Sequence, residues 1–301
     1  MDTLDATLLD RVDAESVFVE TNGVRLHTVQ AGPDDGPLVV LLHGFPECWY
    51  GWHRQLGPLA DAGYRVVVPD QRGYNLSEKP SGVSSYHIRE LAADIVGLVD
   101  ALGDEQAAVA GHDWGAAVAW WLALEYPDRL SKLCIVNVPH PTVFERTLRS
   151  SWSQRKNSWY ILWFQLPVLP ELTFRLGNHW LLADSLQSTS RSDAFTETDI
   201  DRYRLAWSQP GAVTGMLNWY RAIARARPTP VRQQVAVPTR MLWGADDVAL
   251  DVEMAHKSIE YCTDGELQVV DDATHWILHE EPALAVETLL DLLDSPLAST
   301  E

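Results

Sequence analysis

The sequence predicts an α/β fold class, in which a mostly parallel sheet carries helices on both faces and a helical region is inserted. Short apolar segments alternate with segments of helical periodicity up to residue 140, as is typical of parallel strands buried on both faces. This alternation stops between residues 141 and 235 and then resumes. A length of 301 residues also suggests about two domains. We therefore expect a core domain formed by residues 1–140 and 236–301, and a helical cap formed by residues 141–235.

The elements before the insertion follow from local patterns. A hairpin is expected at residues 17–30, because Asn22-Gly23 is a tight-turn signal. Residues 84–102 place apolar side chains three and four positions apart, as an amphipathic helix does. The remaining expected elements are strands at 37–42, 65–68, 107–110 and 133–138, and helices at 50–62 and 116–126.

The insertion is rich in tryptophan. Six of the thirteen tryptophans lie between residues 141 and 235. Flat amphipathic rings pack well around nonpolar ligands, so we expect these tryptophans to form the wall of an apolar cavity. After the insertion, strands are expected at residues 239–243 and 267–270 and a closing helix at 282–293, which places the insertion after the sixth strand.

The segment Gly111-His112-Asp113-Trp114-Gly115-Ala116 lies between an expected strand and an expected helix. Its glycines, two residues before and two after the centre, give it the pattern of a nucleophile elbow, with Asp113 where a serine hydrolase has serine. Such a turn forces its central residue into strained φ and ψ. A carboxylate attacks saturated carbon and forms an alkyl ester. The expected substrate therefore carries a strained ring or a leaving group at an sp³ carbon.

An aspartate nucleophile needs a base that activates water for hydrolysis of its ester. Asp246 and Asp247 follow the strand at 239–243, and His275 follows the strand at 267–270. Both loops are at the carboxyl ends of strands, where open α/β sheets place their sites. The order nucleophile, acid and histidine is that of the α/β-hydrolases. One of the two aspartates is thus expected to orient His275.

The ester also needs hydrogen-bond donors for the oxyanion that forms during its hydrolysis. The segment His43-Gly44-Phe45-Pro46-Glu47 follows the strand at 37–42, and its glycine allows the backbone to approach closely. We expect the backbone amides of Phe45 and Trp114 to form the oxyanion hole. His43 and His112 are expected to pack around the site rather than to react.

Several motifs carry a resemblance to one family. They are His43-Gly44-Phe45-Pro46-Glu47, Asp70-Gln71-Arg72-Gly73-Tyr74, Gly111-His112-Asp113-Trp114-Gly115, Tyr160-Ile161-Leu162-Trp163-Phe164-Gln165 and Asn218-Trp219-Tyr220-Arg221. From about residue 16 to residue 293 the chain resembles the epoxide hydrolases of the α/β-hydrolase superfamily, of the bacterial and soluble mammalian type. The resemblance implies the α/β-hydrolase fold with an inserted cap. It also implies that Asp247, rather than Asp246, is the acid and that the Phe45-Pro46 bond is cis.

The same resemblance implies a two-step reaction. Asp113 attacks an epoxide carbon while Tyr160 and Tyr220 donate hydrogen bonds to the epoxide oxygen. His275, oriented by Asp247, then activates the water that hydrolyses the ester, and a vicinal diol is released. No cofactor and no metal are expected, and the expected partners are a small apolar epoxide and water. Residues 166–170, Leu-Pro-Val-Leu-Pro, depart from the family pattern of an acidic residue and glycine, which leaves the shape of the pocket open.

Other functions were weighed against this one. A haloalkane dehalogenase shares the aspartate, the histidine and the tryptophan after the nucleophile, but usually has a polar residue at the Phe45 position and lacks the two cap tyrosines. A fluoroacetate dehalogenase would have arginine at the Trp114 position. A non-catalytic ligand receptor of the same fold would not require an intact set of reactive residues. A serine esterase is disfavoured because the elbow has no serine or cysteine.

Composition limits the partners and the location. The formal net charge of −19 argues against nucleic acid and anionic membrane surfaces. Three cysteines without metal-ligand spacing are expected to be reduced, buried thiols. The acidic N-terminus does not have the pattern of a signal peptide, and no apolar segment reaches about 18 residues. We expect a cytoplasmic protein that is a monomer or a homodimer.

Overall fold

Eight strands form one sheet in the computed structural model, which describes residues 8–226 and 228–296. The strand order is β1-β2-β4-β3-β5-β6-β7-β8. The pairs β1–β2 and β2–β4 are antiparallel, and every other pair is parallel. The strands are β1 (Ala14–Thr21), β2 (Val24–Ala31), β3 (Leu38–Leu42), β4 (Arg65–Pro69), β5 (Ala107–His112), β6 (Leu130–Val136), β7 (Thr239–Gly244) and β8 (Gly265–Val270). The predicted mostly parallel sheet is therefore confirmed.

The inner strands are buried on both faces, as their apolar sequences predicted. Every residue of β3 and β5 is buried. At the antiparallel edge, Asn22 and Gly23 both have positive φ, which a two-residue hairpin turn requires, and Thr21 pairs with Val24. The acidic N-terminal segment, in which we saw no signal peptide, lies partly outside the described residues because these begin at residue 8.

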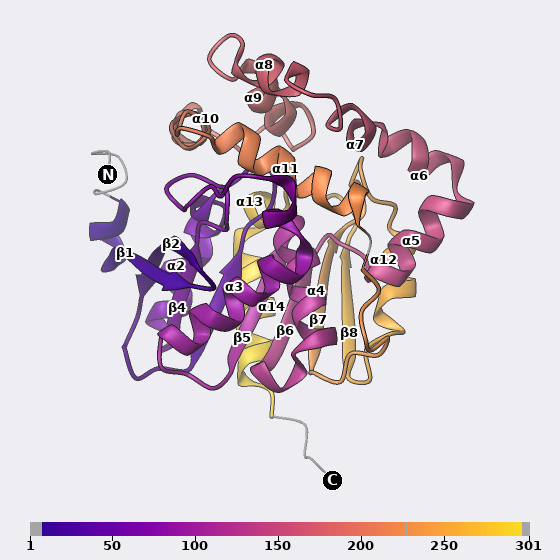
Figure 1. Cartoon of the computed structure of the whole chain (residues 1–301). Coiled ribbons are helices and arrows are strands. Elements are labelled where there is room, and N and C mark those ends of the chain that lie inside the picture. Colours follow the sequence, from indigo (N-terminus) through magenta and orange to yellow (C-terminus); the bar gives the residue numbers. More distant parts are fainter. Residues whose placement is uncertain (1–7, 227, 297–301) are drawn as a thin grey trace.

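Helices cover both faces of the sheet (Figure 1). The helices α3 and α4 pack against each other on one face, and α2 and α14 do so on the other. The remaining short helices of this part follow the loops between strands. The elements are η1 (Trp49–Trp52), α2 (His53–Asp61), η2 (Val83–Tyr86), α3 (Ile88–Ala101), α4 (Trp114–Glu125), η3 (Pro127–Arg129), α12 (Glu253–Ile259), α13 (Ile277–Glu280) and α14 (Pro282–Asp294).

Several expected boundaries were wrong by a few residues. The helix expected from residue 50 begins at His53, after the 3-10 turn Trp49–Trp52, and the hairpin expected from residue 17 begins at Ala14. Three further differences have a clear local reason. The strand expected at 133–138 runs from Leu130 to Val136, because Asn137 takes a positive φ of 50° and ends it. The helix expected from residue 84 begins at Ile88, after a 3-10 turn and the capping residue His87. The helix expected from residue 116 begins at Trp114, directly after Asp113.

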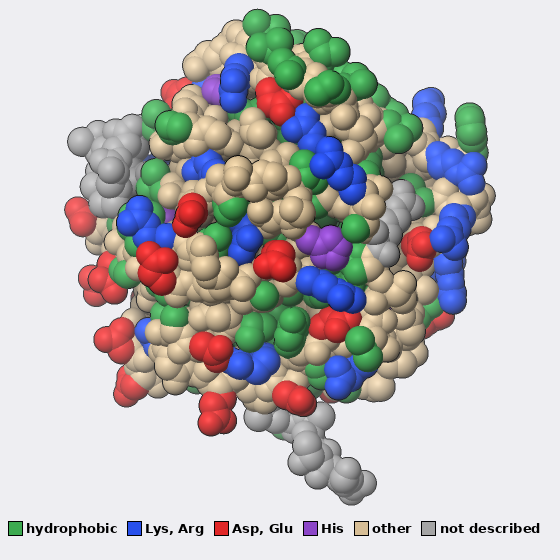
Figure 2. Space-filling model, viewed as in Figure 1, with side chains coloured by type: hydrophobic (Ala, Val, Ile, Leu, Met, Phe, Trp, Pro, Cys, Tyr) green, Lys and Arg blue, Asp and Glu red, His purple; other side chains and the backbone are tan. Residues whose placement is uncertain are grey.

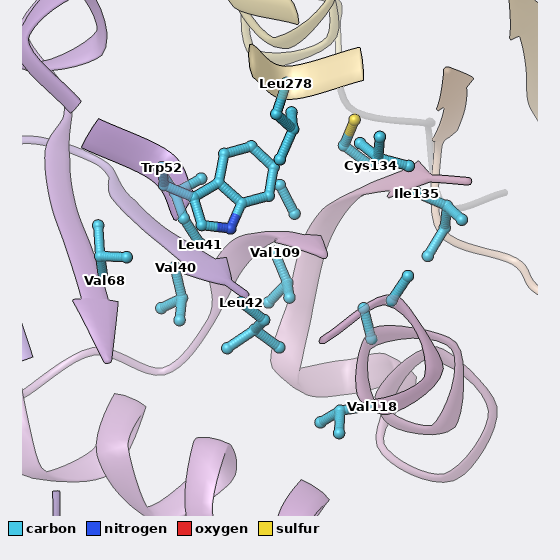
Figure 3. Close-up of a cluster of buried hydrophobic side chains, with 14 of the residues drawn as sticks. Val40, Leu41, Leu42, Trp52, Val68, Val109, Val118, Cys134, Ile135 and Leu278 are labelled. Atoms are coloured by element: carbon cyan, nitrogen blue, oxygen red, sulfur yellow. The ribbon is translucent and has the colours of Figure 1, made fainter. Parts of the chain in front are cut away.

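The core between sheet and helices is close-packed. Figure 3 shows Trp52 in contact range of β3 and α13, with Leu41, Val109 and Leu278 around it. Trp52 and Leu41 are completely buried. Truncating one such leucine to alanine costs about 2–5 kcal/mol of stability, so the sheet is a rigid base for the loops at its carboxyl edge.

A helical insertion separates β6 from β7, after the sixth strand as predicted. It lies over the carboxyl ends of the parallel strands (Figure 1). Gly215 of the insertion lies so close to Gly73 that a Cβ on Gly215 would be 2.8 Å from the Cα of Gly73. This contact brings the last cap helix down onto the loop after β4. The helices are α5 (Pro141–Ser150), α6 (Trp152–Asn157), α7 (Trp159–Trp163), α8 (Leu169–Arg175), α9 (Trp180–Ser188), α10 (Glu197–Trp207) and α11 (Ala212–Arg225).

The outer surface of the insertion is unusually apolar. In Figure 2, hydrophobic side chains gather along the upper edge of the molecule, over α8 and α9, whereas acidic side chains gather over the sheet. Among the described residues, no helix has both the length and the hydropathy that a crossing of the bilayer requires.

Candidate active site

Asp113 lies at the tip of the turn between β5 and α4. Its φ of 49° and ψ of −121° are rare for a residue with a side chain, as the elbow motif predicted. The turn is closely packed: a Cβ on Gly115 would lie 2.7 Å from the carbonyl oxygen of His43, and one on Gly111 would lie 2.6 Å from the backbone nitrogen of Ala116. Only glycine fits at both positions, and the turn therefore holds the Asp113 carboxylate in a fixed direction.

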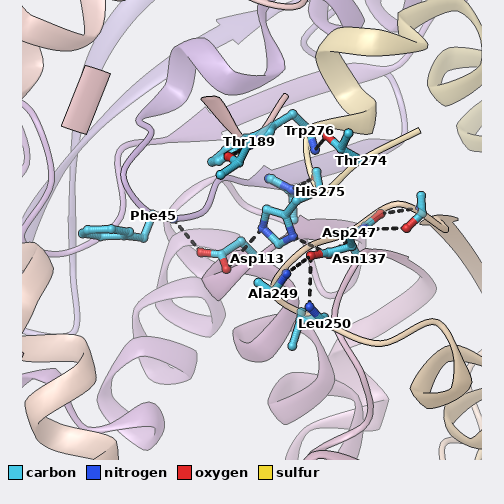
Figure 4. A network of polar contacts seen from close by, with 12 residues as sticks. Phe45, Asp113, Asn137, Thr189, Asp247, Ala249, Leu250, Thr274, His275 and Trp276 are labelled. Carbon is cyan, nitrogen blue, oxygen red and sulfur yellow. Dashed lines mark hydrogen bonds and ion pairs between the residues drawn. The ribbon is translucent and has the colours of Figure 1, made fainter. Parts of the chain in front are cut away.

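His275 lies between two carboxylates (Figure 4). Its Nδ1 is 2.7 Å from Oδ2 of Asp247, and its Nε2 is 3.5 Å from Oδ2 of Asp113. Asp247 is completely buried, whereas the side chain of Asp113 keeps 21% exposure and is open to a ligand. Asp246, the other aspartate considered for this place, is exposed. The structure thus brings Asp113, Asp247 and His275 together and leaves Asp246 out.

Asp247 is held by several hydrogen bonds besides that to His275. The side-chain amide of Asn137 donates to it at 2.8 Å, and the backbone amides of Ala249 and Leu250 donate at 2.8 and 3.0 Å. Burial alone would raise the pKa of Asp247, but His275 and the donors from Asn137 and Ala249 outweigh it, and the pKa lies below its ordinary value. Asp247 therefore stays ionised and fixes the orientation of the imidazole.

The charge of His275 is set by the two carboxylates. Burial alone would lower its pKa, but the charges of Asp247 and Asp113 and their hydrogen bonds raise the pKa well above the ordinary histidine value. The free protein thus carries an imidazolium between two carboxylates near neutral pH. Any event that removes the charge of Asp113 removes part of the cause of this raised pKa.

The loop after β3 brings a backbone donor to Asp113. The Phe45 amide donates a hydrogen bond of 2.7 Å to Oδ1 of Asp113, and the Phe45-Pro46 bond is cis, as expected. Gly44 permits this approach, because a Cβ there would lie 2.7 Å from the same oxygen. Trp114 is the first residue of α4, so its amide is one of the four that a helix leaves without an internal acceptor. Both expected oxyanion-hole residues thus flank the carboxylate.

Two cap tyrosines lie near the nucleophile turn, and Tyr220 packs edge to face against the ring of Trp114 with 5.0 Å between centroids. Tyr160 lies on α7 and Tyr220 on α11, and their rings meet edge to face with 5.9 Å between centroids. Burial and then the charge of Asp113 raise the pKa of both phenols. A hydrogen bond from Trp114 acts on Tyr220 in the opposite direction. Both phenols are therefore protonated donors within the electrostatic reach of Asp113.

Aromatic rings surround the two phenols, but few of them are the expected tryptophans. The ring of Phe45 contacts Tyr220, Phe164 and Phe174 at centroid distances of 5.2, 5.7 and 6.1 Å. The prediction that the cap tryptophans wall the cavity was wrong for three of six, because they lie on short helices whose inner positions are already filled by other aromatic residues. These three are Trp152, Trp159 and Trp180, with exposures of 79%, 62% and 60%.

A buried polar cluster behind the triad combines His112, which was expected to pack around the site, with Glu47, His279 and Tyr203, whose roles were not predicted. Glu47 is completely buried and lies 2.8 Å from Nε2 of His279 and 3.2 Å from Nδ1 of His112, and Tyr203 of α10 donates to it at 2.6 Å. Burial opposes its ionisation, but the two histidines hold the pKa of Glu47 well below its ordinary value. His112 also lies 2.8 Å from the carbonyl oxygen of His275. The cluster thus supports the loop that carries His275. The one sequence signal for it was the position of Glu47 in the motif after Phe45.

His43 plays the packing part expected of it. Its Nε2 accepts a hydrogen bond of 3.0 Å from the backbone amide of Gln71, and the Gln71 side chain donates back to the His43 carbonyl at 2.6 Å. Arg72 forms a buried ion pair with Asp94. These contacts join the loops after β3 and β4, and they account structurally for the Asp70-Gln71-Arg72-Gly73-Tyr74 motif.

Comparison with known proteins agrees with this arrangement. Residues 37–282 match the family described as alpha/beta hydrolase fold, and the chain belongs to that family. Individual relatives indicate the subgroup of that family to which the chain is similar. The chain is 36% identical to "Epoxide hydrolase 1" of Caenorhabditis elegans, over 93% of this chain and 70% of that one. It is 49% identical to "AB hydrolase superfamily protein YfhM" of Bacillus subtilis, over 92% of this chain and 96% of that one.

The structural comparison leads to the same group. A crystal structure of Bacillus megaterium epoxide hydrolase in complex with an inhibitor has a TM-score of 0.86 and 31% identity, over 93% of this chain and all of that one. Within the α/β-hydrolases, the chain is a member of the epoxide hydrolases.

Proposed function

We propose that the protein hydrolyses an apolar epoxide to a vicinal diol through an ester on Asp113. The observation that carries this proposal is one accessible carboxylate, that of Asp113, with the His275 ring 3.5 Å away and two protonated phenols, Tyr160 and Tyr220, within reach of its charge. Such a set supplies a nucleophile, a base and acids for a poor leaving group. The aromatic rings around Tyr220 support an apolar substrate.

In the first step, a carboxylate oxygen of Asp113 forms a bond to one epoxide carbon, and the bond from that carbon to the epoxide oxygen breaks. The departing oxygen is a strongly basic alkoxide and needs hydrogen bonds and a proton. Tyr160 and Tyr220 are suited to supply them, because their raised pKa keeps both phenols protonated across the physiological range. The product of this step is a hydroxyalkyl ester of Asp113.

In the second step, His275 takes a proton from a water molecule, and the hydroxide attacks the ester carbonyl. The amides of Phe45 and Trp114 stabilise the oxyanion, and collapse of that intermediate releases the diol and restores the carboxylate. Esterification favours this step, because it removes the negative charge of Asp113 that helps to raise the pKa of His275. The imidazolium of the free protein thus becomes a neutral base when the ester needs one. The proton that it loses replaces the one that a tyrosine gave to the departing oxygen, and His275 regains a proton from the attacking water.

Release of halide from a haloalkane is the competing reaction with the same nucleophile. A halide needs only N–H donors, and the indole of Trp114 is one candidate. The hydrogen bond of Trp114 to Tyr220 favours a different use of that indole, which is to orient the phenol. Opening of an epoxide is therefore the better match to this donor set.

Trapping of the ester tests the mechanism. The variant His275→Gln should still be alkylated, because the attack of Asp113 needs no base, and the ester should persist. Mass spectrometry of the intact protein should find one added substrate mass, located on the peptide that contains Asp113. The double variant Asp113→Asn/His275→Gln is the matched control and should gain nothing. The epoxide used must be one that the parent protein turns over. An adduct in both variants, or an adduct in neither variant, would reject Asp113 as the nucleophile.

Two further proposals concern the location and the assembly of the protein. We place the protein in the cytoplasm as a monomer or homodimer, without nucleic acid partners. Of its thiols, Cys48 and Cys134 are buried and Cys262 is half-buried, which fits a reducing compartment. Cell fractionation and light scattering of the purified protein test these two statements.

A further inference from the structure

The outer rim of the cap exposes a long series of large apolar side chains. Fourteen large hydrophobic residues are exposed in the described part of the chain, and nine of them lie within residues 152–180. Monomeric proteins rarely expose contiguous apolar surface on this scale unless it is used for binding. We call this surface the rim. Its exposed members are Trp152, Trp159, Leu162, Leu166, Val168, Leu169, Leu172, Leu176 and Trp180.

The rim is the outer face of the same short helices that carry the inner wall of the site. On α7, the ring of Tyr160 packs against Tyr220 and its phenol feels the charge of Asp113, whereas its neighbour Trp159 is 62% exposed. On α8, Phe174 is buried against Phe45, whereas Leu176 just after the helix is 67% exposed. A single layer of helix therefore separates the rim from the reacting groups.

The charge of the cap is opposite to that of the rest of the chain. Residues 141–235 contain twelve Lys and Arg against seven Asp and Glu, whereas the remainder contains eleven against thirty-five. The overall negative charge thus belongs to the core, and the argument from net charge against anionic surfaces does not extend to the cap.

Cations lie within the rim itself. Arg155, Lys156 and Arg175 are exposed. The only acidic residue of the sequence 152–180 is Glu171, which is neutralised by contacts of 2.6 and 3.1 Å with Arg221. Figure 2 shows basic side chains at the right edge, over α5 and α6, next to the hydrophobic upper edge.

We propose that the rim is a docking surface for an anionic lipid membrane. Tryptophan and leucine enter the headgroup region, while Lys and Arg beside them contact anionic headgroups. The acidic core would face away from the membrane, so the charge asymmetry orients the molecule. A second copy of the chain fits less well, because a two-fold contact of rim with rim would bring two cationic surfaces together.

Membrane docking would give the proposed epoxide hydrolysis a source of substrate, and only this statement about substrate rests on the proposed function. Lipophilic epoxides concentrate in membranes, and the docked cap would place the site one helix layer from that reservoir. Binding of the rim to lipid does not itself require the reaction. The inactive variant Asp113→Asn should therefore bind membranes as the parent protein does, which separates failure of the one proposal from failure of the other.

Co-sedimentation of the full chain with vesicles tests the proposal. The protein should bind vesicles of phosphatidylcholine with about one third phosphatidylglycerol, should bind pure phosphatidylcholine far less, and should be released as salt rises to about 0.5 M. The variant Lys156→Glu/Arg175→Glu should bind at least about 20-fold more weakly than the parent. The control variant Lys257→Glu, on the core, should bind as the parent does.

A second pair of variants tests the apolar part. Trp152→Gln/Leu176→Gln/Trp180→Gln should lose binding, and Phe18→Gln/Leu76→Gln, exposed apolar positions of the core, should keep it. Thermal melting and turnover of a water-soluble epoxide should be unchanged in all four variants. Failure of the parent protein to bind anionic vesicles at low salt, or equal binding by the rim variants, would overturn the proposal. The proposal would also be overturned if the parent protein formed a dimer in solution, the rim variants were monomers, and no vesicle binding was seen.

Discussion

The sheet and the cap hold their parts of the candidate site by different forces. The groups carried by the sheet are fixed by hydrogen bonds: His275 to Asp247 at 2.7 Å and the Phe45 amide to Asp113 at 2.7 Å. Tyr160 and Tyr220, carried by the cap, are placed mainly by ring packing, with neighbouring centroids 4.8–5.9 Å away, and Tyr220 adds one hydrogen bond with Trp114. Hydrogen bonds fix a direction, whereas ring packing fixes volume and tolerates small displacements.

This difference matches the chemistry asked of each region. Ester hydrolysis has the same geometry for any substrate, so its groups gain from rigid support. Ring opening must accommodate epoxides of different shapes, and its donors gain from a surround that can shift. The predictions below test whether each region depends on the kind of support that the structure gives it.

The largest effect is expected in the rigid region. Asp247→Asn should reduce turnover by about 10³- to 10⁴-fold, because an amide neither stabilises the imidazolium nor fixes its tautomer. Asp246→Asn is the matched control, one residue away but exposed, and should leave turnover near that of the parent. Steady-state kinetics decides between them. A larger loss for Asp246→Asn would mean that the orienting acid was assigned to the wrong residue.

A smaller effect is expected from each cap donor. Tyr160→Phe and Tyr220→Phe should each slow alkylation by roughly 10- to 100-fold and together by about 10³-fold or more, because each phenol partly covers for the other. Hydrolysis of a preformed ester should change little. Rapid-quench kinetics separates the two steps, and phenyl for phenol is nearly isosteric, so folding should be preserved. A dehalogenase would be favoured by two results together: the parent releases halide from haloalkanes faster than it opens any epoxide, and the double variant keeps that rate.

The pKa of His275 should fall when the charge of Asp113 alone is removed and Asp247 is kept. The pKa of His275 is raised in the free protein, so its ionisation contributes stability that is present below the ordinary pKa near 6.5 and is lost as pH rises through the raised value. Asp113→Asn removes one carboxylate and should lower that pKa, which ¹⁵N NMR of the imidazole can follow. In the parent, ester hydrolysis in single turnover should reach its plateau at a lower pH than the NMR titration of the free protein. Coincidence of the two curves would mean that esterification does not change the base.

Sequence reasoning reached most of the sheet region and less of the cap. Asp113 and His275 follow strands whose apolar runs are easily read, and the chain order of the elbow, acid and histidine is itself informative. Asp247 and Asp246 are adjacent and chemically identical, so the choice between them came from resemblance, and only the fold shows which one is buried. The roles of all these residues stay predictions until they are tested by substitution.

The cap was harder for physical reasons. Its helices are short and amphipathic in more than one direction, so composition alone does not say which face is inner. Trp159 and Tyr160 are neighbours in sequence, yet Trp159 is exposed to solvent and Tyr160 packs against Phe164 and Tyr220 in the interior. Glu47 and Tyr203 were missed because their contact joins residues far apart in the chain: the motif marks Glu47 but does not reveal its partner.

The smallest effect tests one of the charged hydrogen bonds that join the cap to the core, the bond between Tyr203 and Glu47. Tyr203→Phe removes the 2.6 Å donor to the buried Glu47 and should lower the free energy of unfolding by about 2 kcal/mol, because the carboxylate loses one of its three partners in a site without water access. Turnover should change less than in either Tyr160→Phe or Tyr220→Phe, since Tyr203 touches no reacting atom. Tyr261→Phe, whose hydroxyl accepts a surface hydrogen bond from Arg146, is the matched control and should stay within about 0.5 kcal/mol of the parent. Urea denaturation measures both. Equal stabilities of the two variants would mean that this hydrogen bond adds no net stability, and that packing and the other contacts hold the cap at this point.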